Sequence, residues 1–337
     1  MTDLKRADMH LHTSFSGWRR LHLIDARDCY VSPDAAFATA RQRGMDFVCF
    51  TDHDTLDGAL DFLSRHPEAE PHVILGEEVE VRFPGSPQWL HLNVYGLDER
   101  THADLARTRA DCFEAVTYLR EKGLLFVLNH PFQSFRSIGA ARRHLAALLP
   151  LLPAIEVCNS TSPRSHRPVL EAMLLRGGSF PRAWVGGSDA HTARRIAAAY
   201  TTAPGASKQE FLDSIRQGRC TIGGDALGVP ALIRDVYQII GEYYRTTSGS
   251  LLPTGEGLDL SNILGSVALL PPVLVGLPAV LAALHMARQE WIARGGSWAR
   301  ESRAWVASKT ACPVTLLMFP PGAMPMPPTW AARTSDA

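Results

Sequence analysis

The sequence has no excess of charge of either sign. Its 337 residues include 34 Lys plus Arg and 34 Asp plus Glu, so the formal net charge is zero. A chain without a basic excess has no general field that attracts nucleic acid or an acidic lipid surface. It also lacks a basic, aromatic-rich stripe that could follow a nucleic-acid backbone. We therefore expect no binding of duplex nucleic acid, and an anionic ligand must be bound by local side chains.

The sequence has few cysteines, and none of them forms a C-x-x-C pair. The six are Cys29, Cys49, Cys112, Cys158, Cys220 and Cys312. This spacing argues against a disulfide framework or a thiolate zinc site and favours reduced thiols. The first residues, "MTDLKRADMHLHT", contain no apolar run of the kind found in a secretory signal. Both observations predict a cytoplasmic location.

Charged residues are absent from residues 260–287, between Asp259 and Arg288. This run is long enough to cross a bilayer, for which about 20 apolar residues suffice. Pro271, Pro272 and Pro278 would interrupt a single helix, however. Two interpretations remain open, a hydrophobic helical pair packed on the preceding domain and an interfacial or re-entrant membrane anchor. We expect a helical hydrophobic extension over residues 226–320 and a disordered, Pro-rich tail over residues 321–337.

The first two-thirds of the chain alternates between short apolar runs and helical patterns. Ser32 followed by Pro33, and Ser207 with Glu210, predict helix starts. This alternation predicts mostly parallel strands with helical crossovers, and the number of strands favours an α/β barrel over residues 1–225. The seven expected strands cover residues 7–13, 46–53, 72–81, 89–97, 124–131, 154–160 and 183–191.

Potential metal ligands stand at the ends of most of these strands. Strand ends of an α/β barrel converge on one face, so ligands that are distant in sequence can meet there. Histidine nitrogens mixed with carboxylate oxygens, without thiolates, suit zinc, manganese or iron. Two or three such ions lower the pKa of a bound water and clamp a phosphoryl group, which favours phosphoester hydrolysis. The candidates are His10, His12, Asp52, His53, Asp54, Glu77, Glu78, Glu80, His91, His130, Asp189 and His191.

Five segments, taken in order, resemble the motifs of the PHP (polymerase and histidinol phosphatase) superfamily. They are "DMHLHTSFS", "FTDHDTLDG", "GEEVE", "LNHPF" and "GGSDAHT". The likeness covers about residues 7–225. It implies a distorted (β/α)7 barrel of the α/β class, with two or three divalent metal ions and phosphoesterase activity.

The resemblance also implies a ligand set. The first ion would be bound by His10, His12, Glu78 and Asp189. The second would share Glu78 and add His91 and His130. Glu78 is preferred to Glu77 because the family pattern is G-x-E, which starts here at Gly76.

A third ion would be bound by His53, His191 and a residue soon after the H-x-H motif. Gly17 stands where the family has a ligand, so His22, Asp25 or Asp28 would have to replace it. Without a third ion, His53 and His191 could act as catalytic proton-transfer groups.

Several other residues are candidates for supporting roles. Asp8 and Asn129 are expected to orient ligands, and an arginine near a strand end could bind phosphate. The arginine candidates are Arg136, Arg164, Arg194 and Arg195. Since no candidate ligand lies in residues 251–337, we expect this part to be dispensable for activity.

The expected function is hydrolysis of a small phosphomonoester, such as a nucleotide or sugar phosphate. An exonuclease acting on short oligonucleotides and a non-catalytic metal-binding PHP module are the alternatives. Membrane contact, if the extension provides it, would involve residues 260–287.

Overall fold

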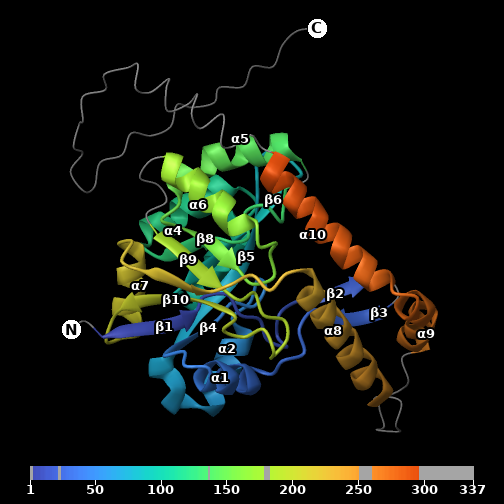
Figure 1. The fold of residues 1–337 in the computed structure, drawn as a ribbon. Coiled ribbons are helices and arrows are strands. Elements are labelled where there is room, and N and C mark those ends of the chain that lie inside the picture. Colours follow the sequence, from blue (N-terminus) through green and yellow to red (C-terminus); the bar gives the residue numbers. More distant parts are fainter. Residues whose placement is uncertain (1–2, 22–23, 136, 178–182, 250–259, 296–337) are drawn as a thin grey trace, which may run out of the picture.

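The computed structural model describes residues 3–21, 24–135, 137–177, 183–249 and 260–295 (Figure 1). Its main feature is a nine-stranded sheet in the order β11-β10-β1-β4-β5-β6-β7-β8-β9. All seven expected strands are present. The strands are β1 (Leu4–Asp8), β4 (Phe47–Phe50), β5 (Val73–Arg82), β6 (Trp89–Tyr95), β7 (Leu125–Leu128), β8 (Ala154–Asn159), β9 (Ala183–Gly187), β10 (Ala199–Pro204) and β11 (Thr221–Gly224).

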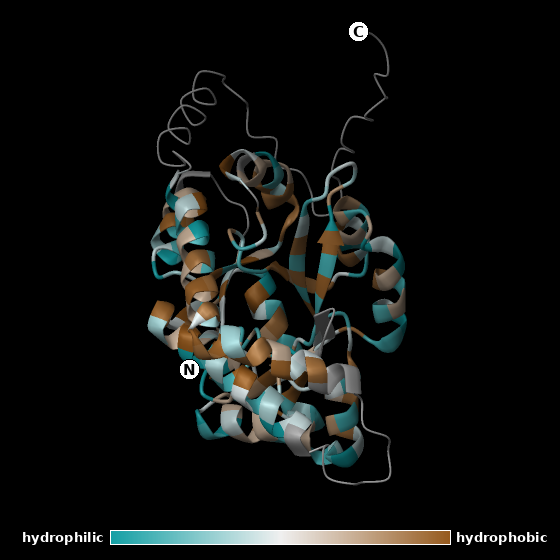
Figure 2. Cartoon of the chain, turned by 90° about the vertical axis from the view of Figure 1, so that its right-hand side faces the viewer, coloured by the Kyte–Doolittle hydropathy of each residue, from teal (hydrophilic) through white to brown (hydrophobic). Residues whose placement is uncertain are grey.

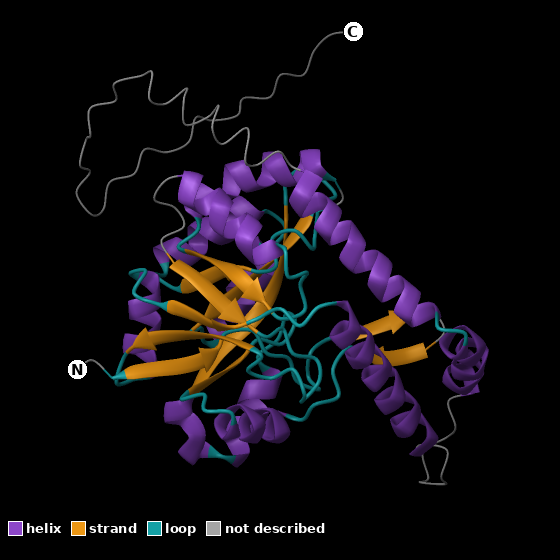
Figure 3. Ribbon diagram, in the orientation of Figure 1, coloured by secondary structure: helices purple, strands orange, loops and turns teal. Residues whose placement is uncertain are grey.

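The sheet curls until its two edges meet, which gives the predicted barrel-like α/β fold (Figure 3). Thr201 on β10, the neighbour of the edge strand β11, links this side of the sheet to the other edge strand, β9, through its hydroxyl group. This group accepts from the backbone N–H of Gly186 on β9 at 2.9 Å and donates to the Gly186 carbonyl at 3.0 Å. A side chain at Gly186 would collide with Ile222 and the Tyr200 carbonyl, so the close approach requires glycine.

The sheet is mixed rather than mostly parallel. Pairs β1–β4, β4–β5, β7–β8 and β8–β9 are parallel, whereas β6 is antiparallel to both β5 and β7. The loop between β5 and β6 holds only residues 83–88, with Gly85 at φ +66°. Such a loop can form a hairpin but not a parallel crossover. The first residues of β6 therefore lie beside the last residues of β5, at the same end of the barrel.

Helices cover the outside of the sheet, and their starts follow the expected signals. The Ser32 hydroxyl accepts from Ala35 N at 3.2 Å with Pro33 in the first turn, and the Ser207 hydroxyl accepts from Glu210 N at 3.3 Å. The helices are α1 (Pro33–Gln42), α2 (Asp57–Arg65), α3 (Glu99–Thr108), α4 (Cys112–Glu121), α5 (Ile138–Leu148), α6 (His166–Gly177) and α7 (Lys208–Arg216). Short 3-10 helices cover Pro67–His72 and Leu149–Leu151.

The predicted helical extension consists of α8 (Val229–Gly249), α9 (Leu260–Leu274) and α10 (Leu277–Gly295). It lies on the side of the barrel that bears the strand-end loops (Figure 1). Helix α10 packs against α5, α6 and α8, and buries Met286, Ile292 and Ala293. Helix α9 packs against β3 (Ile24–Arg27), which forms a hairpin with β2 (Trp18–Leu21). The predicted Pro-rich tail lies outside the described residues.

The extension does not contain a straight membrane-spanning helix among its described residues. Leu264–Leu274 and Leu277–Gly295 together meet the length and composition of a span, but the pair is bent by 69°. Gly276, at φ +85°, makes the break, and Pro271 and Pro272 precede it in the last turn of α9. The predicted interruption by prolines agrees with this geometry.

Candidate metal centre

Eight predicted ligands converge at one end of the barrel. His10 and His12 follow β1, His53 follows β4, and His130 follows β7. Glu78 lies within β5 and His91 near the start of β6, and the hairpin brings the two to the same place. Asp189 and His191 follow β9. The structure therefore brings together all the residues that the sequence predicted as ligands of the first two ions, and His53 and His191 beside them.

Glu78 lies at the middle of this cluster and is buried. Its Oε1 atom lies 3.0 Å from both His91 Nδ1 and His130 Nε2. The other oxygen, Oε2, lies 3.3 Å from His10 Nε2, 3.2 Å from His12 Nε2 and 3.1 Å from His53 Nδ1. A carboxylate between two groups of imidazoles is suited to bridge two cations.

Glu77 points away from the cluster, as the alternation of a strand requires. Its Oε2 atom lies 2.7 Å from His102 Nδ1 on α3. Burial raises the pKa of Glu77 to about 7, although His102 opposes this shift. The register predicted from G-x-E therefore agrees with the side-chain directions.

Asp189 is a second carboxylate close to His10 and His12. Its Oδ1 atom lies 3.6 Å from His10 Nε2 and 3.4 Å from His12 Nε2. Burial opposes protonation of His12, but hydrogen bonds to Asp189 and Glu78 raise its pKa to about 10. In the metal-free protein, protons on the imidazoles thus balance the negative charge of the buried carboxylates. Divalent cations would take the place of these protons on binding.

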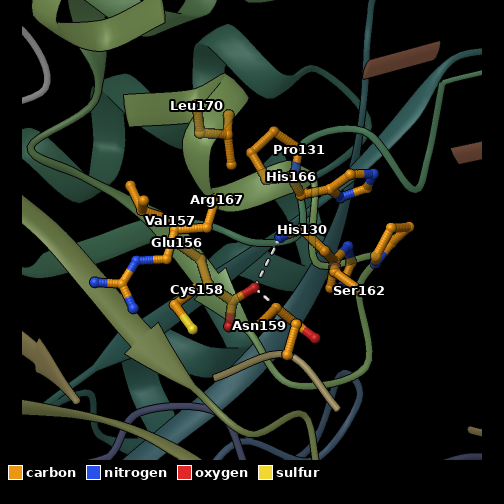
Figure 4. Close-up of a pocket in the computed structure, with 12 residues that line it drawn as sticks. His130, Pro131, Glu156, Val157, Cys158, Asn159, Ser162, His166, Arg167 and Leu170 are labelled. Carbon is orange, nitrogen blue, oxygen red and sulfur yellow. Dashed lines mark hydrogen bonds between the residues drawn. The ribbon is translucent and has the colours of Figure 1, made fainter. Parts of the chain in front are cut away.

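Glu156 on β8 supports this cluster and was not predicted. Its Oε1 atom accepts from His10 Nδ1 at 3.0 Å, which leaves His10 Nε2 facing Glu78 and Asp189. Its Oε2 atom accepts from the His130 backbone N–H at 2.8 Å and from Asn159 Nδ2 at 3.0 Å (Figure 4). The signal in the sequence was a single carboxylate inside the apolar strand "AIEVC".

Asp8 and Asn129 occupy the orienting positions predicted for them. Asp8 accepts from the backbone N–H groups of His10, Ser188 and Ala197 at 3.2, 2.8 and 2.7 Å, so it joins the loops that carry the ligands. Asn129 Nδ2 donates to Glu78 Oε1 at 2.9 Å. Neither side chain is part of the ligand groups described below.

His53 and His191 lie at the more open side of the cluster, next to Asp28. The Asp28 Oδ2 atom lies 3.7 Å from His53 Nε2 and 4.0 Å from His191 Nε2. Neither oxygen of Asp28 accepts a hydrogen bond from the residues that the structure describes. A buried carboxylate without hydrogen-bond donors, facing two imidazoles, fits a cation. Of the three replacements considered for Gly17, Asp28 is thus placed at this site, His22 lies outside the described residues, and the Asp25 side chain is not described.

The tautomers of the imidazoles suit metal binding. His191 Nδ1 donates to the Asp189 carbonyl at 3.1 Å, so its lone pair is on Nε2, the atom that faces Asp28. Burial lowers the pKa of both His53 and His191. Both rings are therefore neutral at neutral pH.

Four sets of three donor atoms, one atom from each residue, lie within 4.8 Å of one another. Each set could hold a metal ion. The backbone is strained at two of the donors. His130, at φ +27°, and Asp189, at φ +53°, adopt a conformation that non-glycine residues avoid. The sets are His12–His53–His191, His10–Glu78–His130, His10–His12–Asp189 and His53–Glu78–His91.

The other carboxylates at the strand ends serve the fold instead. Asp52 accepts from Thr13 N at 2.6 Å and from its hydroxyl at 2.7 Å. Asp54 pairs with Arg109 at 2.5 Å, and Glu80 with Arg82 at 2.9 Å. These three candidates are therefore not ligands in this arrangement.

The arginines proposed from the sequence as phosphate ligands are also placed elsewhere. Arg195 is fully buried, pairs with Asp235 on α8 and donates to the Ser160 carbonyl at 2.7 Å. Arg164 Nε donates to the Ala226 carbonyl at 3.1 Å. Nothing in the described contacts directs Arg194 to the cluster, and Arg136 lies outside the described residues.

The cluster opens into a cleft of about 500 Å³. Its walls include residues of the barrel and, unexpectedly, two residues of α10. The cleft is lined by Asp28, His53, Glu78, Trp89, His91, His130, Gln133, Ser134, Asp189, His191, His285 and Arg288. The C-terminal extension thus contributes two residues to the lining of the cleft, a contact that the sequence did not predict.

Two family models match the chain. Residues 8–119 match the PHP domain, and residues 179–220 match the PHP-associated model. An uncharacterized protein of Methanocaldococcus jannaschii is 25% identical over 127 residues, which cover 38% of this chain and 68% of that protein. The resemblance to the PHP superfamily is therefore confirmed.

Solved structures give a weaker likeness. One is a two-domain protein of Bacteroides vulgatus that contains a predicted PHP-like metal-dependent phosphoesterase, with 18% identity, 71% of each chain covered and a TM-score of 0.47. Another is PsfC of Pseudomonas syringae, with 19% identity, 72% of this chain and 99% of that chain covered, and a TM-score of 0.49.

Proposed function

We propose that this chain, whose residues 8–119 match the PHP domain, hydrolyses small phosphomonoesters, such as nucleotide or sugar phosphates. The observation that carries this proposal is the position of Glu78. A single buried carboxylate lies within 3.3 Å of nitrogens from five imidazoles, with Asp189 beside them. Burying so many titratable side chains together costs stability, and such clusters are typical of functional sites.

The ligands divide among the ions in the way that the resemblance implies. His10, His12, Asp189 and Glu78 would bind the first ion, and Glu78, His91 and His130 would bind the second. His53 and His191 would bind a third ion together with Asp28. Zinc, manganese or iron at these sites would supply a water of lowered pKa and positive charge that stabilises the phosphoryl transition state.

The residues of the chain hold this centre in place. Glu156 and the Ser16 hydroxyl, 3.0 Å from His12 Nδ1, fix the rings of His10 and His12. His53 and His191, neutral at neutral pH, offer lone pairs on the side that faces the cleft. Without a third ion, His191 Nε2 could instead accept a proton from the attacking water and donate it to the leaving oxygen.

The size of the cleft favours small substrates over strands of nucleic acid. Helix α10 forms one wall of the cleft, and a cleft volume of about 500 Å³ suits one small ligand. The described residues that line the cleft include one arginine, Arg288, and no lysine. We therefore prefer a phosphomonoesterase to an exonuclease.

The test is a substrate panel with defined metals. Metal-free protein is loaded separately with Mn²⁺, Zn²⁺ or Fe²⁺ and assayed with phosphomonoesters, a phosphodiester and a short oligonucleotide. We expect metal-dependent phosphate release from the monoesters at the highest kcat/KM. Faster cleavage of the oligonucleotide would indicate the exonuclease, and metal binding without any hydrolysis would indicate a non-catalytic module.

A further inference from the structure

Arg288 on α10 reaches the cleft that holds the candidate metal ligands. The helix begins next to α9 and ends beside α5, so it crosses the side of the barrel that bears the strand-end loops (Figures 1 and 3). Both Arg288 and His285, one turn earlier, line this cleft with Glu78, His91 and His130. No sequence motif pointed to either residue.

The guanidinium of Arg288 is held in place by backbone carbonyls. Its Nη1 atom donates to the Phe135 carbonyl at 3.2 Å and its Nη2 atom to the Gln133 carbonyl at 2.9 Å. Within the described part of the chain, no carboxylate forms an ion pair with it. Its positive charge is therefore fixed at the cleft without being neutralised, and it retains donors beyond the two in use.

We propose that Arg288 binds the phosphate of the substrate, so that the C-terminal extension completes the binding site. This inference rests on the proposed function. The group that binds is an anionic oxygen of a phosphoryl group, for which a guanidinium with spare donors is well suited. Its role is to select and position a doubly charged phosphomonoester.

The experiment compares Arg288→Gln with Arg294→Gln. Glutamine keeps a donor for the backbone carbonyls but removes the charge. Arg294 belongs to the same helix, is exposed, pairs with Glu290 and is not part of the cleft, so it is the matched control. KM, kcat and inhibition by inorganic phosphate are measured on the metal-loaded full-length proteins, and phosphate binding is measured by calorimetry.

We expect Arg288→Gln to raise KM and the phosphate dissociation constant about 10- to 100-fold, as for a lost charge-assisted hydrogen bond. Metal content should not change, and Arg288→Lys should restore part of the affinity. Equal phosphate affinity in wild type, Arg288→Gln and Arg294→Gln would overturn the proposal. If the wild type hydrolyses no phosphomonoester, the proposed function fails, but calorimetry still tests phosphate binding by Arg288.

A separate observation concerns the outer face of α9 and α10. Large apolar side chains are exposed along both helices, and Figure 2 looks onto this side of the molecule. Leu274 and Val275, at the bend, are 76% and 81% exposed. The others are Leu264, Val267, Leu270, Leu277, Val280, Leu281, Leu284 and Trp291. So many neighbouring exposed apolar residues indicate a binding surface.

We infer that this face lies in the surface of a lipid bilayer. Residues 260–287 contain no charged side chain, whereas a protein interface normally has a polar, partly charged rim. Exposed Trp291 follows the apolar stretch, as is common at a membrane interface. The 69° bend and the packing of α10 on the barrel suit helices that lie on a bilayer.

Vesicle flotation of the full-length protein tests this inference, with phosphatidylcholine vesicles and vesicles that also contain phosphatidylglycerol. We expect binding to both, and a loss of at least tenfold for the double variant Leu274→Glu and Val275→Glu. Leu4→Glu, which changes an exposed leucine on β1, is the control and should not alter binding. Absence of flotation, or a dimer that the double variant dissociates, would overturn the inference.

Discussion

At the scale of residues, neighbouring glutamates have opposite environments. Glu78 faces the histidines, while Glu77 faces His102. The sequence predicted this choice from the motif register, and the alternation of β5 explains it. Glu156 was missed because a strand of apolar residues gives no reason to look for a ligand-orienting group. Its role depends on the distance between β8 and the loop after β1, which only the tertiary fold determines.

Glu78→Gln should abolish activity and reduce the metal content to at most one ion per chain, because an amide cannot supply two anionic oxygens. Glu77→Gln should keep both metal content and most activity. Metal analysis and phosphate release are measured for both variants, with circular dichroism to verify folding. The reverse pattern would show that the register is off by one residue.

Asp28→Asn tests the third ion in a similar way. Asp28 faces His53 and His191 and accepts no hydrogen bond from the described residues. Its replacement should therefore lower the affinity for one ion about 10- to 100-fold and leave the binding of the other two unchanged. Asp61→Asn, which changes an exposed carboxylate on α2, is the control. Three tightly bound ions in the Asp28 variant would contradict this assignment.

The titration of the cluster predicts proton release on metal binding. In the metal-free protein, burial opposes protonation of His12, but Asp189 and Glu78 raise its pKa to about 10, above the unfolded value near 6.5. This contribution to stability is fully present below about pH 6.5 and is lost as pH rises toward 10. We expect the Tm of the metal-free protein to fall over that range, and weakly buffered solutions to acidify when metal is added. Metal binding without proton release would argue against this proton-compensated cluster.

At the scale of elements, the positions of the seven strands were predicted correctly, but the mostly parallel direction expected for them was wrong for β6. Short apolar runs indicate strands, whereas the antiparallel direction of β6 follows from a six-residue loop, 83–88, and its Gly85. The hairpin matters for function because it places His91 beside Glu78. The hairpin of β2 and β3 and the closing strands β10 and β11 lacked a signal strong enough to be predicted.

Gly187, at the end of β9, sets the distance between two elements of the site. A Cβ atom there would lie 2.4 Å from His10 Cβ and 2.9 Å from Glu156 Oε1. Gly187→Ala should therefore displace His10, destabilise the fold by about 1–3 kcal/mol and reduce metal affinity. Gly241→Ala in α8, where nothing lies within 4 Å, should be neutral or slightly stabilising. Urea unfolding and metal titration compare the two, and equal effects would contradict the close packing at Gly187.

At the scale of the whole molecule, the barrel and the extension act together. The sequence indicated two regions of different composition and left packing of the second on the first as one of two interpretations, but it named no residues that would join them. The structure joins them through the buried Arg195–Asp235 pair and through the packing of α10 on α5 and α6. Such contacts between distant segments cannot be read from local patterns.

Truncation after residue 249 should therefore lower both stability and activity, because it exposes the surface covered by Met286 and Ile292 and removes Arg288 from the cleft. Removal of residues 321–337 alone serves as the control, and we expect it to have little effect. Thermal unfolding and phosphate release are measured for both. Full activity of the shorter protein would restore the earlier expectation that the extension is dispensable.

The most direct test of the central claim is an anomalous-scattering map of metal-loaded crystals, recorded at the absorption edge of the bound metal. The account predicts two strong peaks, one on each side of the Glu78 carboxylate, and a third among His53, His191 and Asp28. A single peak, or peaks that do not contact Glu78, would contradict it.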